Sequence, residues 1–154
     1  MIKCSIVIPT YQHLQDALIP CLNSIFKYTD LSQMEILIVA NGCTDGTKEY
    51  VEGLIAQGKP IRLFNYSEPL GFSKAVNIGL SEAKGEYLLI LNNDTEFQAT
   101  NWFELLKQPF INDSSVGLVG PIQHTEVGFE FLIFFCVLIN RITFNKVGLL
   151  IKTQ

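Results

Sequence analysis

One stretch, residues 87–96, constrains the fold of this chain more than any other. Its first half (YLLIL) carries no charge, and its second half (NNDTE) brings two amides and two carboxylates. An apolar run of this length, between a Lys-Gly turn signal and polar residues, is typical of a strand buried on both faces. Such a strand delivers the residues that follow it to the carboxyl edge of a parallel sheet, where open α/β sheets bind ligands. We therefore expect Asp94 at the centre of a binding site.

Size and composition indicate one globular domain. A chain of 154 residues is long enough to bury a core. Its composition, 48% hydrophobic and 17% charged residues, excludes a disordered chain or a coiled coil. The net charge of −4, with no cluster of lysine or arginine, argues against a nucleic-acid partner.

The four cysteines and the apolar segments indicate the cellular location of the protein. No cysteine spacing suggests a metal site, so we expect reduced, mostly structural thiols in a cytoplasmic protein. The amino-terminal apolar stretch is too short for a signal peptide. Residues 129–151 are apolar but interrupted, and no run reaches the ~18 residues of a spanning helix. We expect a buried strand and an amphipathic turn there, and leave open a peripheral contact with the inner face of a membrane.

Apolar runs alternate with helical patterns along the chain. Strands are expected at residues 4–8, 35–39, 61–65, 87–91 and 116–119, with Pro9 ending the first. Helices are expected from Pro20, after residue 46, over residues 71–83 and over residues 100–107. The inward apolar stripes of the second and third helices would include Ile55 and Phe72 respectively, and Leu105 would supply apolar bulk in the last. This alternation predicts an α/β domain with a mostly parallel central sheet flanked by helices.

Polar residues follow three of these strands, at 9–11, 40–42 and 92–94, and should share one crevice. The chain has no GxGxxG after its first strand and no Walker lysine, which removes the main support for dinucleotide and P-loop sites. Carboxylate and amide oxygens suit Mg²⁺ or Mn²⁺ holding a diphosphate. The crevice is therefore predicted to bind a nucleotide, with a metal carrying the charge of the leaving group.

Several motifs occur in an order that resembles family 2 glycosyltransferases. They are SIVIPTY at 5–11, NGCTDGT at 41–47, LGFSKA at 70–75, GEYLLILNND at 85–94, GLVGP at 117–121, FCVLINR at 135–141 and FNKVGL at 144–149. The resemblance covers nearly the whole chain and implies a single nucleotide-sugar-binding GT-A domain over residues 1–154. It also implies inverting, metal-dependent sugar transfer from a nucleotide-diphosphate sugar to a saccharide or lipid-linked acceptor.

The resemblance also assigns site residues. Asp94 would bind Mg²⁺ or Mn²⁺, directly or through water, as the last residue of the motif that includes Asn92 and Asn93. Asn41 stands beside the place where the family usually has an aspartate for the base or ribose, and that place here is Ala40. The nucleoside would be bordered by Pro9, Thr10 and Tyr11, and the donor would lie along Gly71, Phe72 and Lys74, with Lys74 near the diphosphate.

Structural alternatives stand beside these assignments. Asp94 could cap the following segment, Asp45 is better explained as a cap, Lys74 could be solvated, and Trp102 and Phe103 are better explained as core than as an acceptor platform. The family usually continues beyond residue 150 with an acidic segment and the catalytic base, and Glu126 and Glu130, the only carboxylates after Asp113, lie in no base motif. The catalytic residue therefore stays unassigned, and a non-catalytic or vestigial nucleotide-sugar-binding module is the alternative to a transferase.

Overall fold

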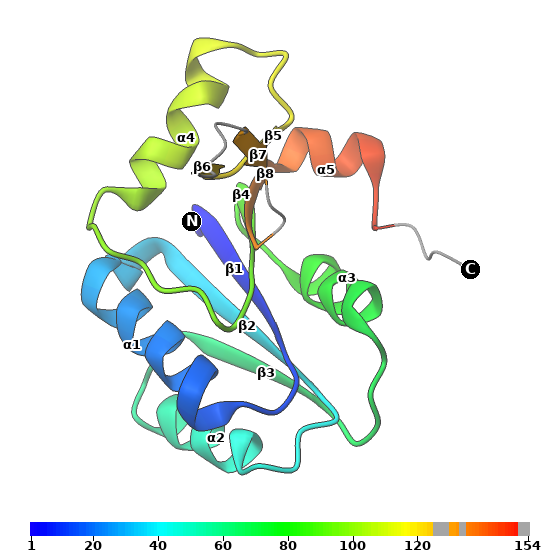
Figure 1. Cartoon of the computed structure of the whole chain (residues 1–154). Helices are drawn as coiled ribbons and strands as arrows, with labels where there is room; N and C mark the ends of the chain where they lie inside the picture. The colour runs from blue at the N-terminus through cyan, green and yellow to red at the C-terminus, as the bar shows by residue number, and fades with distance from the viewer. Residues whose placement is uncertain (125–129, 133–134, 151–154) are drawn as a thin grey trace.

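A six-stranded sheet organises the protein (Figure 1). The structure is a computed structural model that describes residues 1–124, 130–132 and 135–150. The strand order is β3-β2-β1-β4-β8-β5; the first four strands are parallel, and β8 runs antiparallel to both β4 and β5. The strands are β1 Cys4–Thr10, β2 Met34–Asn41, β3 Ile61–Tyr66, β4 Tyr87–Leu91, β5 Leu118–Val119 and β8 Cys136–Asn140, and a separate hairpin pairs β6 Ile122–His124 with β7 Glu130–Leu132.

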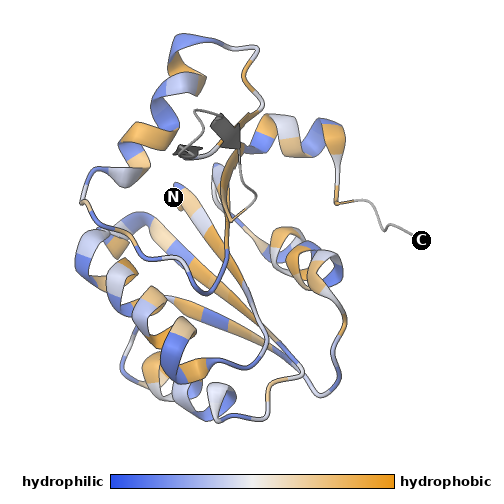
Figure 2. Cartoon of the chain, in the orientation of Figure 1, coloured by the Kyte–Doolittle hydropathy of each residue, from blue (hydrophilic) through white to orange (hydrophobic). Residues whose placement is uncertain are grey.

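Helices cover both faces of this sheet, as Figure 1 shows for α1 and α2 on one side and α3 on the other. The sheet strands are predominantly apolar in Figure 2, which matches their burial. One core cluster joins the sheet to α1, α2 and α4, and a second joins it to α3. The α-helices are α1 Ile19–Tyr28, α2 Thr47–Ala56, α3 Phe72–Glu82, α4 Trp102–Asn112 and α5 Arg141–Val147; a π-helical turn, η1 Leu14–Leu18, precedes α1, and a 3₁₀ turn, η2 Leu31–Gln33, precedes β2.

The predicted α/β domain with a mostly parallel sheet is confirmed, and the strand at residues 87–91 has the predicted bounds. Pro9 does not end β1 as predicted, because the strand continues to Thr10. The ladder from β1 to β4 ends at Val7, so a proline at position 9 removes no hydrogen bond on that side. The segment after residue 129 contains the expected buried strand, β8, followed by α5.

Ile55 and Phe72, predicted to face inward, are exposed, and so is Leu105, which was expected to supply apolar bulk in its helix. Phe72 and Leu105 line pockets instead of packing on the sheet. The helix predicted to end at residue 107 continues to Asn112 through Pro109. Its last turns are held by packing, because the ring of Phe110 lies 5.7 Å from that of Tyr87 in β4.

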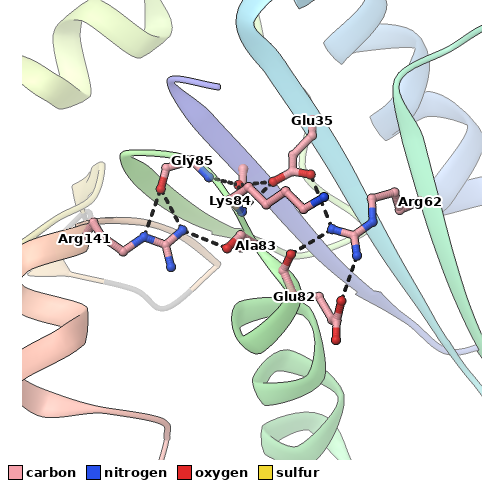
Figure 3. A network of polar contacts seen from close by, with 8 residues as sticks. Glu35, Arg62, Glu82, Ala83, Lys84, Gly85 and Arg141 are labelled. Atoms are coloured by element: carbon pink, nitrogen blue, oxygen red, sulfur yellow. Dashed lines mark hydrogen bonds and ion pairs between the residues drawn. The ribbon is translucent and has the colours of Figure 1, made fainter. Parts of the chain in front are cut away.

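The amino edge of the sheet is closed by a polar network around the buried carboxylate of Glu35 (Figure 3). Glu35 Oε1 accepts hydrogen bonds from Ser5 Oγ at 2.6 Å and from the backbone N–H of Lys84 at 2.7 Å. Arg62 lies 3.5 Å from Glu35 and pairs with Glu82 at 2.7 Å. A buried carboxylate is tolerated when it is paired and hydrogen-bonded in this way. The network therefore fixes the turn between α3 and β4, at the edge opposite to the ends of β1, β2 and β4.

The sequence-based expectations about thiols and membranes can be compared with the described residues. All four cysteines are free thiols, and Cys4, Cys21 and Cys136 are buried, as predicted for structural thiols. No helix within the described residues is long and apolar enough to cross a membrane.

Candidate functional site

A cleft of about 400 Å³ lies at the carboxyl ends of β1, β2 and β4. The parallel strands bring together residues that are far apart in the sequence, as the alternation of strands and helices predicted. Nine of the ten predicted site residues line this cleft, and Pro69 is an additional lining residue that the sequence analysis did not single out. The lining residues are Pro9, Thr10, Tyr11, Asn41, Pro69, Gly71, Phe72, Asn92, Asn93 and Asp94.

Lys74 is the predicted site residue that the structure places elsewhere. It is exposed and lines a different pocket, together with Tyr66 and Asn77. Phe72, which does line the cleft, is two residues earlier in the same helix, and two residues correspond to about 200° around a helix axis. The side chain of Lys74 is therefore directed away from the cleft, which corrects its predicted place beside a diphosphate.

Hydrogen bonds join β1 to the residues after β4 at the floor of the cleft. The amide nitrogen of Asn93 donates to the hydroxyl of Thr10 at 2.9 Å, and Thr10 is buried. The backbone N–H of Asn92 donates to the carbonyl of Phe135 at 2.8 Å. These bonds hold residues 92–94 in place directly beneath the cleft.

Asn92 carries an unsatisfied acceptor at this position. Within the described part of the chain, its Oδ1 is the one fully buried side-chain polar atom without a hydrogen-bond partner. Buried polar atoms in native proteins usually have a partner, so a bare carbonyl oxygen here favours a ligand, a water or an ion nearby. Asp94, two residues further on, contributes an exposed carboxylate to the same cleft.

The loop after β1 has an unusual backbone beside the cleft. Gln12 and His13 have φ values of 54° and 59°, a region that costs a residue other than glycine about 1–3 kcal/mol. The side chain of Gln12 bonds to Thr44, with Nε2 donating to Thr44 Oγ1 at 3.1 Å and Oε1 accepting from the Thr44 N–H at 3.2 Å. The loop is therefore held to the β2–α2 loop, which fixes the position of Tyr11 at the rim.

Asp45 also joins the loop after β1 to the loop after β2, which is the structural role that the sequence analysis favoured. Its Oδ2 accepts from the backbone N–H of Leu14 at 2.8 Å, and its Oδ1 accepts from the hydroxyl of Thr47 at 2.7 Å. Partial burial would raise the pKa of this carboxyl, but the hydrogen bonds from Thr47 and Leu14 outweigh it and hold the pKa below its usual range. Asp45 therefore joins the start of η1 to the start of α2 and does not line the cleft.

The wall of the cleft at β2 is built by a close approach of two loops. Gly42 has a φ of 81°, and a Cβ at this position would lie 2.8 Å from the nitrogen and Cδ of Pro69. The neighbouring Asn41 is buried, and its Oδ1 accepts a hydrogen bond from the backbone N–H of Leu70. Gly71, with a φ of 84°, is the residue before α3, and Phe72, the first residue of the helix, is 46% exposed at the rim.

The side chains of the cleft limit how it could bind a metal ion. The described residues contain no group of three or more His, Cys, Asp or Glu side chains that could hold a metal ion. A cation in this cleft would thus be bound by one carboxylate, with the remaining ligands coming from amide oxygens, water or the bound molecule. This is a common arrangement for Mg²⁺ with phosphate ligands, because Mg²⁺ usually binds one or two carboxylates together with substrate phosphates.

A second, largely apolar pocket of about 490 Å³ begins at Thr95, directly after the residues that line the cleft. Trp102 and Phe103 are buried, and Trp102 stacks on Phe97 with ring centroids 4.2 Å apart, which confirms the prediction that they belong to the core. Trp102 still lines this pocket, as does Glu96, which carries a carboxylate. The sequence analysis did not predict this pocket, because its walls come from α4 and from the ends of β5 and β8.

Comparison with known proteins agrees with this geometry. The sequence model described as Glycosyl transferase family 2 matches residues 5–134. The chain belongs to this family. It is 33% identical over 138 residues to glycosyltransferase GlyG of Streptococcus pneumoniae, an alignment that covers 86% of this chain and 45% of GlyG. The chain thus spans less than half the length of that relative.

Two solved structures resemble the fold of this family 2 chain. The mannosyltransferase PcManGT of Pyrobaculum calidifontis, solved with GDP-Man and Mn²⁺, superposes with a TM-score of 0.79 at 19% identity, covering 96% of this chain and 47% of PcManGT. Residues 1–349 of S. aureus TarS, solved with UDP-GlcNAc, give a TM-score of 0.63 at 23% identity, covering 76% of this chain and 33% of TarS. The predicted GT-A fold is therefore confirmed.

Proposed function

We propose that this chain binds a nucleoside-diphosphate sugar in the cleft and takes part in inverting transfer of the sugar to an acceptor. The observation that carries the proposal is the meeting of three strand ends, which brings Thr10, Asn41 and Asp94 to one cleft. The exposed aromatic rings of Tyr11 and Phe72 at its rim suit a planar base, since aromatic side chains stack on bases. The family membership and the nucleotide sugars bound to PcManGT and TarS support the same ligand class.

The proposal includes a divalent cation, Mg²⁺ or Mn²⁺, held by Asp94. The cleft fits such an ion, because it combines an exposed carboxylate with an unsatisfied amide oxygen at Asn92 and offers no soft sulfur ligand. When bound, the cation would neutralise the charge of the departing diphosphate. PcManGT, which shares the fold, was solved with Mn²⁺.

The acceptor, a saccharide or a lipid-linked sugar, would occupy the pocket that begins at Thr95. A molecule there would lie next to the end of the donor held at Asp94, because the two sites are adjacent along the backbone. Inverting transfer requires a group that accepts the proton of the attacking hydroxyl. We assign this role to Glu96, the carboxylate that lines this pocket. Of the carboxylates discussed in the sequence analysis, Glu126 lies outside the described residues and Glu130 lies in β7.

Calorimetric titration tests the donor and cation parts of the proposal. UDP, GDP, dTDP, CDP and ADP are titrated into the protein with Mn²⁺ and with EDTA. We expect binding of at least one nucleotide with Mn²⁺, and a loss of tenfold or more in EDTA and in Asp94→Asn, which keeps the shape of the side chain. Lys74→Ala is the matched control and should change affinity less than twofold, because Lys74 lies outside the cleft. Equal affinity in EDTA would reject the cation, and no binding of any nucleotide would reject the donor site.

Product formation from a nucleotide sugar and a panel of saccharide and lipid-linked acceptors tests the transfer step. Glu96→Gln should keep nucleotide affinity and lower the rate by ~10²–10⁴, the usual contribution of a general base. Transfer that is unaffected by this substitution would reject Glu96 as the base. Binding of the donor without any transfer would identify this chain as a donor-binding module.

A further inference from the structure

Helix α5 and the edge strand β5 expose apolar side chains beside one another. Ile142 is 69% exposed and Val147 is 78% exposed, although isoleucine and valine are among the residues most often buried in proteins. Leu149, just after the helix, and Leu118 in β5 are exposed as well. Val147, Leu149 and Leu118 line one groove of about 390 Å³. A single exposed apolar residue is ordinary, whereas several that adjoin one another indicate an interaction site.

The carboxyl-terminal part of the sequence is basic, and the rest is acidic. No aspartate or glutamate follows Glu130, and residues 131–154 contain Arg141, Lys146 and Lys152. This segment therefore carries a charge of +3 within a chain of net charge −4, which leaves −7 for residues 1–130. Such asymmetry suggests a nucleic acid or a membrane as the partner. Apolar side chains beside the cations favour the membrane.

The two cations of α5 are not neutralised by carboxylates. Among the residues that the structure describes, neither Arg141 nor Lys146 forms an ion pair. The guanidinium of Arg141 donates to the neutral carbonyls of Ala83 at 2.9 Å and Gly85 at 2.7 Å (Figure 3). Lys146 is exposed and lies one helical turn after Ile142, so the two side chains are neighbours on the helix surface.

The inner side of α5 is fixed to the protein, so the outer side is presented in a defined orientation. Figure 1 shows α5 at the end of β8, and Phe144 packs against the core cluster that contains α3. A Cβ at Gly117, the residue before β5, would lie 3.1 Å from Thr143 Cγ2, which shows how closely helix and strand approach. We call the outward residues Leu118, Ile142, Lys146, Val147 and Leu149 the α5 surface. None of them lines the nucleotide cleft.

We propose that the α5 surface docks on the anionic face of a lipid bilayer. The apolar side chains would enter the boundary between headgroups and acyl chains, and the ammonium group of Lys146 would stay among the anionic headgroups. Helix α5 has seven residues, so it would lie on the bilayer and not span it. Charge favours a bilayer over a second copy of the chain, because two copies joined through this surface would bring uncompensated cations together.

Flotation of the 154-residue chain with vesicles tests the proposal. The vesicles contain phosphatidylcholine alone, or phosphatidylcholine and phosphatidylglycerol in equal parts. We expect binding to the anionic vesicles that weakens as salt is added. Lys146→Gln should weaken it about fivefold, the effect of one lysine near an anionic surface, and Ile142→Ser about tenfold. Ile111→Ser, 62% exposed in α4, and Lys48→Gln, exposed in α2, are the matched controls and should bind like the wild-type protein.

Each contrary result has a clear meaning, provided that circular dichroism shows all variants to be folded. Absence of binding to anionic vesicles would overturn the proposal, and so would equal binding to neutral vesicles. Equal losses in the control variants would show that the contact lies elsewhere. Sedimentation equilibrium tests the competing occupant: a dimer that dissociates in Ile142→Ser, together with no vesicle binding, would assign the α5 surface to a second copy. The proposed nucleotide site is tested separately, because the α5 surface lies outside the cleft.

Discussion

Gly79 lies where α3 presses on the central strand β1, and its replacement by alanine tests how tightly the two pack. The residue is buried in the middle of α3. A Cβ built at this position would overlap Val7 Cγ1 and would lie 3.3 Å from Val7 Cβ and Cγ2. Val7 is fully buried and is β-branched, so its side chain has few other rotamers to adopt. The added methyl group therefore forces the helix or the strand to move.

The size of the effect follows from two opposing contributions. Overpacking in a well-packed core costs about 1–3 kcal/mol, and the depth of the overlap with Val7 places Gly79→Ala in the upper part of that range. Alanine is favoured over glycine in a helix by about 1 kcal/mol. The free energy of unfolding should therefore fall by about 1–2 kcal/mol, which lowers the unfolding temperature by about 2–8 °C in a chain of this size.

Gly53→Ala is the matched control. Gly53 is an exposed residue within α2, and a Cβ there would meet nothing within 4 Å. The helical preference then acts alone, so the unfolding temperature should rise by about 2–4 °C. Urea and thermal unfolding followed by circular dichroism measure both variants.

A double variant identifies the contact responsible. Val7→Ala alone removes two buried methyl groups, at about 0.8 kcal/mol each before any cavity is counted. In the double variant the new methyl group at position 79 would occupy part of the space left by Val7, so the combined loss should be smaller than the sum of the single losses by about 1–2 kcal/mol. Additive losses, or a Gly79→Ala protein as stable as the wild type, would refute the packing that the structure shows between α3 and β1.

The remaining predictions concern thiols, alkaline pH and the loop beside the cleft. A thiol reagent at pH 8 should label the native protein only at Cys43, because burial raises the pKa of Cys21 and of Cys136 to about 12; labelling that persists in Cys43→Ser would contradict this. In the native state the buried thiols keep their protons at pH 9–11, whereas in the unfolded state a thiol, with a pKa near 8.5, loses its proton. The unfolding temperature should therefore fall as pH rises above about 9. An unfolding temperature that stays constant from pH 8 to 11 would contradict this. Asp45→Ala should lower the unfolding temperature by about 2–4 °C and weaken nucleotide binding, because it removes the bonds that hold the loop beside the cleft. Asp113→Ala removes a similar turn away from the cleft and should leave nucleotide affinity unchanged. Equal nucleotide affinity in the two variants would show that Asp45 does not influence the cleft.

Much of the site was predictable because it depends on a rule of topology. The apolar run at residues 87–91 indicated a buried strand, and the polar residues after three such strands had to meet if the strands were parallel. Thr10, Asn41 and Asp94 do meet in one cleft. The roles of these residues in binding stay predictions, and their common location follows from the pattern of the sequence alone.

The positions of individual side chains were less predictable, because they depend on neighbours that are distant in the sequence. Phe72 fits the apolar stripe of α3, yet it is exposed, since this first residue of the helix lines the cleft instead of packing in the core. Lys74 belongs to a motif of the family, yet the rotation of the helix directs it to another pocket. Pro9 could continue β1 only because β4 stops pairing at Val7.

The sequence by itself therefore determined the buried parallel strands and the edge at which the cleft lies, because burial and the period of a strand are local properties of a chain. The strand order, with β8 antiparallel between β4 and β5, came only from the tertiary structure. The tertiary structure alone decided what the cleft presents to a ligand. The bare oxygen of Asn92 depends on which groups surround it after folding. The orientation of the Asn41 amide depends on the N–H of Leu70, which no local pattern connects to it. Hydrogen-bonding direction is fixed by partners in space, and those partners meet only when the loops between distant strands have closed on one another.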